Sequence, residues 1–302
     1  MELSVMDKYN WIVTERFQEG KKFNQELCED EIVTSSLYAV VDGSTDKSGL
    51  RYQWQDNTRE GKDSAREVSS GKFAALHAGK IIKELQPGVP PVEVIDIISE
   101  SLNIAILDQY PNIKDSDRPS CSVAIYDPML KHIFKVGDCW HGYKLHDNSL
   151  TSHQHNIKID SVLGDMRSLM IEALAKSGTP WTPSSGLLDQ GRELIMPFLK
   201  IQGVFANTLH EYGYGDINGQ CVPSEYIEIF DIPENVKEIV LATDGYPSII
   251  IDENLSLSLA EDNLTYLIIK DPLCVSELKG NKGLLKDQLS YDDRSWLQLS
   301  KG

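Results

Sequence analysis

Three apolar segments of the chain each end in an aspartate, and these residues raise the question of which chemistry the sequence supports. The segments are LYAVVDG, which contains Asp42, IFKVGD, which ends at Asp138, and IVLATDG, which contains Asp244. A single acidic residue after a strand is an ordinary turn former. Several such ends can meet at one edge of a sheet system, where the carboxylates repel one another unless protons or cations intervene. Hard oxygen ligands of this kind suit Mg²⁺ or Mn²⁺ rather than zinc.

Two further acidic pairs have the same potential. Glu29 and Asp30 precede the strand that leads to Asp42, and Asp292 and Asp293 stand just before the last apolar segment, RSWLQL. Side chains of adjacent residues in a strand point to opposite faces, so we expect only one member of the second pair to reach a given ion. The residues alone leave open both a metal site and a set of plain turn formers.

Composition limits the classes of protein to consider. The chain has 302 residues, of which 41% are hydrophobic and 25% charged, and its formal net charge is −17. That balance is typical of a globular protein, and the negative charge disfavours binding to nucleic acid or to an anionic membrane. No apolar run approaches the roughly 18 residues of a membrane span, and we expect no signal peptide. The five scattered cysteines form no C-x-x-C pair, which favours a reducing cytoplasm over a zinc or disulfide framework.

The elements that must carry these carboxylates follow the order strands, two helices, strands, helices, strands, helix, strand. Strand patterns cover 11–17, 31–42, 121–127, 131–138, 226–232, 237–244 and 294–299, and helical patterns cover 64–86, 91–110, two pieces within 160–202, and 258–270. The polar segment 52–63 is typical of a loop. Because strands come in adjacent pairs with short connections, we expect them to be mostly antiparallel.

The motifs ED, VVDGS, SCSVAIYD, KVGDCW, VLATDGY and YDDRS occur in this order from Glu29 to the last strand. Together they resemble the metal-dependent serine/threonine protein phosphatases of the PP2C type, in a bacterial branch of that family. The resemblance implies an α+β fold, a four-layer α-β-β-α sandwich in which two antiparallel sheets pack face to face between helices. It also implies one domain over 1–302, with a helical flap insertion around 160–205.

The resemblance further implies a metal centre and a reaction. Asp42 would bridge two Mn²⁺ or Mg²⁺ ions, Asp244 and Asp292 would hold one of them, and these three would be the catalytic residues. A third, weaker ion bound with the help of Asp138 occurs in some members of the family. A hydroxide bridging the two ions would attack the phosphomonoester of a phosphorylated protein. The implied ligand set is Glu29, Asp30, Asp42, Gly43, Asp138, Asp244 and Asp292.

The sequence departs from the family pattern at the residues that would handle the substrate. The arginine that many members carry four residues before the glutamate is Gln25 here, and Lys21 and Lys22 lie close to it. The histidine that animal members carry two residues after the bridging aspartate is Ser44. We therefore expect Gln25, Lys22 and Ser44 to bind the substrate.

Alternatives to the phosphatase hypothesis come from two other classes of protein. A phosphatase-like domain that has lost catalysis and serves as a binding or regulatory module is the first, and the altered Gln25 and Ser44 favour it. A sugar-nucleotide glycosyltransferase is the remote second, because DGSTD at 42–46 also occurs there, but no strand–helix–strand unit precedes it here. We expect His153 and His155 not to bind metal, and Trp181 either to line a substrate groove or to lie in a loop between helices.

Overall fold

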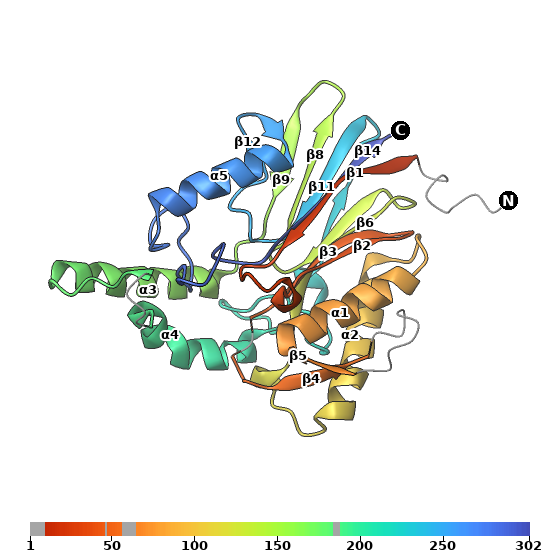
Figure 1. Ribbon diagram of the computed structural model, residues 1–302. Helices are drawn as coiled ribbons and strands as arrows, with labels where there is room; N and C mark the ends of the chain where they lie inside the picture. Colours follow the sequence, from red (N-terminus) through yellow and green to blue (C-terminus); the bar gives the residue numbers. More distant parts are fainter. Residues whose placement is uncertain (1–9, 46, 56–64, 184–187) are drawn as a thin grey trace.

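The fold is built on two five-stranded antiparallel sheets (Figure 1). The computed structural model describes residues 10–45, 47–55, 65–183 and 188–302. The first sheet has the strand order β1 (Trp11–Glu19), β14 (Arg294–Lys301), β11 (Val236–Ala242), β8 (Trp140–Leu145) and β9 (Leu150–His153). The second has the order β10 (Glu228–Asp231), β7 (His132–Val136), β6 (Cys121–Asp127), β3 (Tyr38–Gly43) and β2 (Glu31–Thr34).

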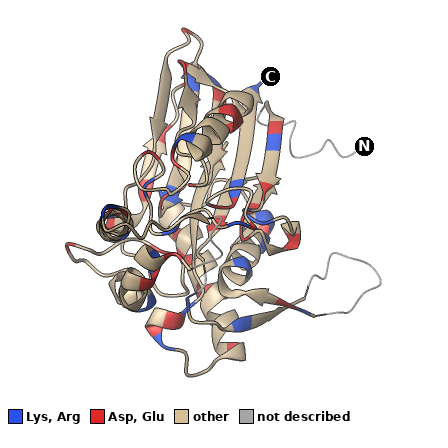
Figure 2. Ribbon diagram, turned by 60° about the vertical axis from the view of Figure 1, so that its left-hand side comes forward, with Lys and Arg blue, Asp and Glu red and all other residues tan. Residues whose placement is uncertain are grey.

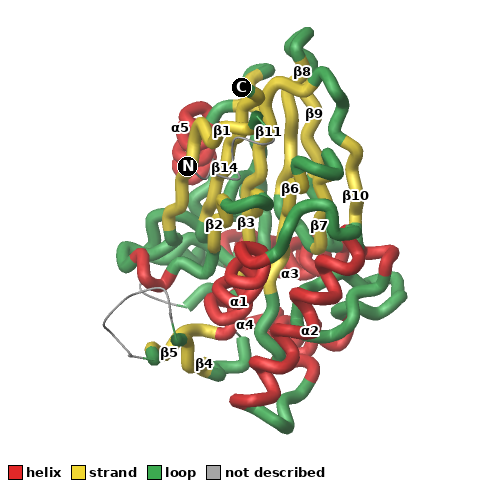
Figure 3. Tube along the Cα trace, turned by 90° about the vertical axis from the view of Figure 1, so that its right-hand side faces the viewer, coloured by secondary structure: helices red, strands yellow, loops and turns green. Residues whose placement is uncertain are grey.

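The two sheets pack face to face, and helices cover their outer faces (Figure 3). Val40 of β3 packs between the sheets against the first sheet, whereas Ala39 and Val41 pack outward beneath α1 (Ser70–Glu84) and α2 (Pro91–Gln109). Burial on both faces explains why β3 is a continuous apolar run. On the other side, α5 (Leu257–Lys270) covers the outer face of β11 and β14. The predicted α-β-β-α sandwich is confirmed.

The antiparallel prediction is also confirmed, but neighbours in the sequence are not always neighbours in a sheet. β10 and β11 follow one another after a short turn, yet β10 pairs with β7 in the second sheet while β11 pairs with β8 and β14 in the first. The turn between them therefore crosses from one sheet to the other. Strand pairing of this kind depends on the packing of the two layers, which no local pattern reports.

Two local predictions were wrong around residue 60. Part of the expected loop is strand β4 (Arg51–Trp54), which pairs with β5 (Arg66–Ser69) and buries Tyr52 against Phe73 with ring centroids 4.5 Å apart. The rest of that predicted loop, residues 56–63, lies outside the described residues. The following helix begins at Ser70 rather than residue 64, because Ser69 caps it by accepting the Lys72 N–H. The hairpins β8–β9 and β12 (Ile250–Ile251) with β13 (Asn254–Leu255) were not predicted.

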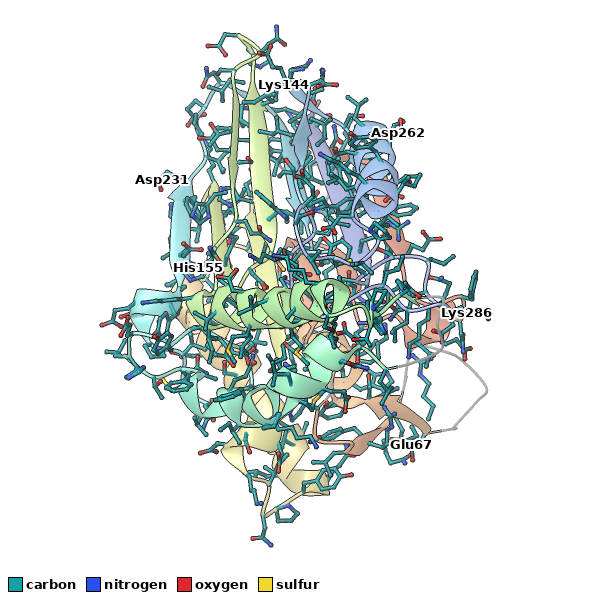
Figure 4. The ribbon with its side chains drawn as sticks, turned by 90° about the vertical axis from the view of Figure 1, so that its left-hand side faces the viewer. Glu67, Lys144, His155, Asp231, Asp262 and Lys286 are labelled. Carbon is teal, nitrogen blue, oxygen red and sulfur yellow. The ribbon has the colours of Figure 1, made fainter. Side chains whose placement is uncertain are left out.

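Helices α3 (Lys158–Lys176) and α4 (Gln190–Ile201) occupy the segment in which the sequence predicts a flap, and they extend beyond one end of the sandwich (Figures 1 and 4). They pack on each other through Leu163, Ile195 and Leu199. Arg167 of α3 is fully buried and connects this pair of helices to the loop after α5. None of the helices in the described part of the chain combines the length and the apolar character that crossing a bilayer requires.

The Arg167 guanidinium makes three hydrogen bonds that join distant segments. Nε donates to Asp189 Oδ2 at 2.7 Å, Nη1 to the Cys274 carbonyl at 2.7 Å, and Nη2 to the Leu273 carbonyl at 2.8 Å. Asp189 is itself the N-cap of α4, where it accepts the Arg192 N–H. One buried ion pair thus fixes both helices against the loop.

We expect Arg167→Met to lower the free energy of unfolding by about 3–5 kcal/mol, because it leaves the Asp189 carboxylate buried without its partner. Urea denaturation followed by circular dichroism measures the change. Lys158→Met on the same helix removes two surface contacts, the exposed ion pair with Glu211 and the approach of Nζ to the Tyr212 ring, and should leave stability essentially unchanged. Equal effects of the two substitutions would contradict the anchoring role of Arg167.

Candidate metal centre

Asp42, Asp138 and Asp244 meet at one end of the sandwich. One carboxylate oxygen of each lies within 4.8 Å of the corresponding oxygens of the other two. Asp42 stands near the end of β3, Asp138 follows β7, and Asp244 follows β11, so both sheets contribute. Three strand ends that are far apart in the sequence therefore form one cluster of carboxylate oxygens that could hold a metal ion.

Hydrogen bonds to neighbouring elements hold these three strand ends in position. Asp42 lies opposite Ser122 in the β3–β6 register, and the Ser122 hydroxyl donates to Asp138 Oδ1 at 2.8 Å. The Tyr291 hydroxyl donates to the Asp244 carbonyl at 3.0 Å. The Trp140 indole N–H donates to the Tyr246 carbonyl at 2.8 Å, which fixes the turn after β11. The three carboxylates are thus held by β6, β8 and the segment before β14.

Close backbone contacts around the centre require glycine. A Cβ atom on Gly43 would lie 2.5 Å from the Gly71 carbonyl oxygen, and one on Gly71 would lie 2.3 Å from the Ser44 oxygen. A Cβ on Gly245 would lie 2.1 Å from the Asp293 oxygen. Only a residue without a side chain permits these approaches. They bring the start of α1 against the end of β3, and the Asp244 turn against the acidic pair before β14.

Burial raises the pKa of all three carboxyl groups, and their neighbours add repulsion. Besides burial, the pKa of Asp42 is raised by Asp30, Asp292 and Asp138. The pKa of Asp244 is raised in the same way by Asp42, Asp292 and Asp138. A divalent cation would relieve this repulsion. The all-oxygen donor set fits Mg²⁺ or Mn²⁺.

A second set of acidic side chains lies beside this cluster, and two lysines form ion pairs with it. Lys21 Nζ lies 3.4 Å from Glu29 Oε2, 3.2 Å from Asp292 Oδ1 and 3.2 Å from Asp293 Oδ2. The Lys282 ammonium contacts the other oxygen of Asp292, Oδ2. Burial by itself would raise the pKa of Asp292, but Lys282 and Lys21 together lower it. Both oxygens of Asp292 are therefore engaged by ammonium groups in this structure.

Asp292 and Asp293 both contact the Lys21 ammonium, and the expectation that only one of them reaches a given metal ion stays a prediction. Strand β14 begins only at Arg294, so the alternation of side chains along a strand does not apply to the two residues before it. Asp293 has a further structural task, because Oδ1 accepts the Lys21 N–H at 2.6 Å and Oδ2 accepts the Glu29 N–H at 3.1 Å.

Glu29 and Asp30, the other predicted ligands, contact the elements that carry the cluster. Glu29 Oε1 accepts a hydrogen bond of 2.5 Å from the Ser69 hydroxyl, at the N-cap of α1. Asp30 is fully buried, and its Oδ2 accepts from the Thr243 hydroxyl at 2.8 Å, one residue before Asp244. In the described structure, neither belongs to the three-carboxylate cluster.

The three predicted substrate-binding residues lie in different surroundings. Ser44 lines the cavity that contains the three-carboxylate cluster. Gln25 instead folds its own loop, because its Oε1 accepts the Gly20 N–H at 2.6 Å and its Nε2 donates to the Lys22 carbonyl at 3.0 Å. Lys22 is exposed, and neither it nor Gln25 is among the described residues that line the cavity. The adjacent Lys21 is the lysine that points inward.

The cavity has a volume of about 460 Å³ and carries both signs of charge. Besides the three aspartates, its wall includes Lys47, Arg192 and Lys282. Arg192 Nη1 donates to the Asn281 carbonyl at 2.6 Å, so α4 holds the segment that carries Lys282. The sequence does not indicate these three basic residues, because they come from three separate segments with no common spacing. Lys and Arg are interspersed with Asp and Glu along the helices and connecting segments (Figure 2).

The remaining candidates lie near the cavity or in the core. His155, labelled in Figure 4, lines the cavity, whereas His153 is the last residue of β9. Both histidines face Glu228 Oε1, which lies 3.5 Å from His155 Nδ1 and 3.6 Å from His153 Nε2. No metal-binding cluster among the described residues includes either histidine. Trp181 stands between α3 and α4 in the sequence, and its side chain is buried. It is not among the described residues that line the cavity.

Several known structures with a similar course of the chain are bacterial phosphatases. A bacterial serine phosphatase is 11% identical, with 96% of this chain and 98% of that chain covered and a TM-score of 0.49. The serine/threonine phosphatase PstP/Ppp of Mycobacterium tuberculosis is 13% identical, with 96% and 99% covered and a TM-score of 0.44. Stp1 from Staphylococcus aureus is 13% identical, with 99% and 97% covered and a TM-score of 0.45. No family model and no curated protein matches the chain.

We expect Asp42→Asn to lower Mn²⁺ affinity at least tenfold, because it removes a charge from the centre of the ligand cluster. The fold should remain intact, since repulsion among the buried carboxylates decreases. Isothermal titration calorimetry measures the affinity and thermal unfolding measures the fold. Asp231→Asn, at the exposed end of β10, is the matched control. Unchanged Mn²⁺ affinity in Asp42→Asn would show that the centre lies elsewhere.

Asp293→Asn should lower the free energy of unfolding by about 1–3 kcal/mol, because the amide offers one acceptor oxygen for two buried backbone N–H groups. Chemical denaturation measures the loss, and Asp287→Asn in the exposed part of the preceding loop serves as control. A variant as stable as the control would mean that these two hydrogen bonds contribute nothing.

Proposed function

We propose that this chain is a metal-dependent phosphomonoesterase that acts on phosphoserine and phosphothreonine in proteins. One observation carries the proposal: Asp42, Asp138 and Asp244 converge in a cavity that also presents Lys47, Arg192 and Lys282. The carboxylates suit a hard divalent cation, and the basic side chains suit the oxygens of a phosphate group. Few other ligands require both at once.

The residues of the chain would divide the work as follows. Asp42, Asp138 and Asp244 would hold Mg²⁺ or Mn²⁺, which supplies the charge that activates water and neutralises phosphoryl oxygens. The ammonium and guanidinium groups on the cavity wall would attract and orient the phosphate. Arg192 is already fixed by its hydrogen bond to Asn281, so less conformational freedom is lost when phosphate binds.

A cytoplasmic location belongs to the same proposal. All five cysteines are free thiols, and four of them are buried. Free thiols persist in reducing compartments, where protein kinases and their phosphorylated products also occur. The partner that we propose is therefore a phosphorylated protein of the cytoplasm.

A non-catalytic binding or regulatory module is the second candidate. Two observations favour it: Asp292 is neutralised by two lysines, and Gln25 is engaged within its own loop instead of facing the cavity. Such a module would bind Mn²⁺ and phosphate without turnover.

Hydrolysis of p-nitrophenyl phosphate and of a phosphothreonine peptide separates the two candidates. We expect hydrolysis that requires Mn²⁺ or Mg²⁺, that EDTA abolishes, and that falls at least a hundredfold in Asp244→Asn. The Asp231→Asn variant should retain normal rates. Metal binding without any hydrolysis would favour the module, and activity that returns only with Zn²⁺ would contradict the proposed metal.

A further inference from the structure

Two clusters of acidic side chains lie at the end of the sandwich, and they differ in how their negative charge is balanced. Glu29, Asp292 and Asp293 surround the Lys21 ammonium, and Lys282 adds a second positive charge on Asp292. Among the described residues, no lysine or arginine forms an ion pair with any member of the cluster Asp42, Asp138 and Asp244; the charges there are left to protons or to an added cation. The Asp292 group, in contrast, already contains its cations.

We infer that Lys21 and Lys282 act as built-in cations on the Asp292 side, and that they limit this chain to one tightly bound divalent ion, held by Asp42, Asp138 and Asp244. The inference rests on the proposed function and departs from the two ions that the family resemblance implies. It assigns to two lysines the charge that a second ion would supply.

The position of Lys21 makes its displacement costly. Only 9% of its side chain is exposed, and Nζ is also 3.2 Å from the Thr45 hydroxyl. An ion bound by Asp292 would have to break these contacts or tolerate a positive charge a few ångströms away. Moving the ammonium without giving it new partners would leave a buried charge uncompensated. Both routes weaken binding of a second ion.

Lys282 adds to this barrier from the cavity side. Lys282 contacts Oδ2 of Asp292, whereas Lys21 contacts Oδ1, so the two lysines together engage both oxygens. Because Lys282 also lines the cavity, its ammonium is available to a phosphate oxygen. The charge that neutralises phosphate on this side can thus come from the chain itself.

Calorimetric titration of the full chain with Mn²⁺, combined with native mass spectrometry, tests the inference without relying on activity. Wild type should bind one ion tightly. Lys282→Met should bind a second ion at least tenfold more tightly than wild type does, and Lys21→Met with Lys282→Met should increase this further. Lys286→Met, in the same loop at the surface of the molecule (Figure 4), should behave as wild type.

The outcomes separate this inference from the proposed function. If the double variant that includes Lys21→Met does not fold, the result for Lys282→Met alone decides. The Lys282 side chain is 21% exposed, so its replacement should be tolerated. Two tightly bound ions in wild type, or no gain in Lys282→Met, would overturn the built-in cations and leave the proposed function standing. A loss of phosphate affinity with unchanged Mn²⁺ binding in Lys282→Met would likewise overturn the built-in cations and leave the proposed function standing. No Mn²⁺ binding in wild type would overturn both.

Discussion

Repulsion among buried carboxylates is the constraint on which the end of this sandwich depends. The six acidic side chains of the predicted ligand set and the neighbouring Asp293 lie close together there. They come from both sheets and from the segments before β2 and β14. Burial makes each charge costly, so the structure must compensate every one of them. Hydroxyl groups and two lysines compensate part of the charge.

The backbone is arranged so that this compensation is possible. Glycines at the end of β3, at the start of α1 and after β11 allow segments to approach more closely than any side chain would permit. Ser122 and Thr243 then connect strands through the carboxylates themselves. The centre is therefore part of what joins the two sheets, and its rigidity follows from the sheets that carry it.

The helices α3 and α4 complete the cavity from outside the sandwich. The buried Arg167 ties them to the loop after α5, and Arg192 ties α4 to the segment that carries Lys282. Basic side chains from three segments consequently stand on the same cavity wall as the acidic cluster. The phosphate group of the proposed substrate would benefit from both signs of charge, since its oxygens would need cations while the attacking water would need activation.

What the sequence alone determined was local in origin. Apolar runs that end in aspartate predicted Asp42, Asp138 and Asp244 at strand ends, and the order of elements together with the family motifs predicted the sandwich. These features survive because alternation, strand length and turn residues act over a few positions. Tertiary structure decided the rest: that β10 and β11 lie in different sheets, that Lys21 rather than Lys22 points inward, that Asp292 and Asp293 share one ammonium group, and that Lys47, Arg192 and Lys282 meet at one cavity. Each of these depends on contacts between residues far apart in the chain, whose energies no local pattern contains.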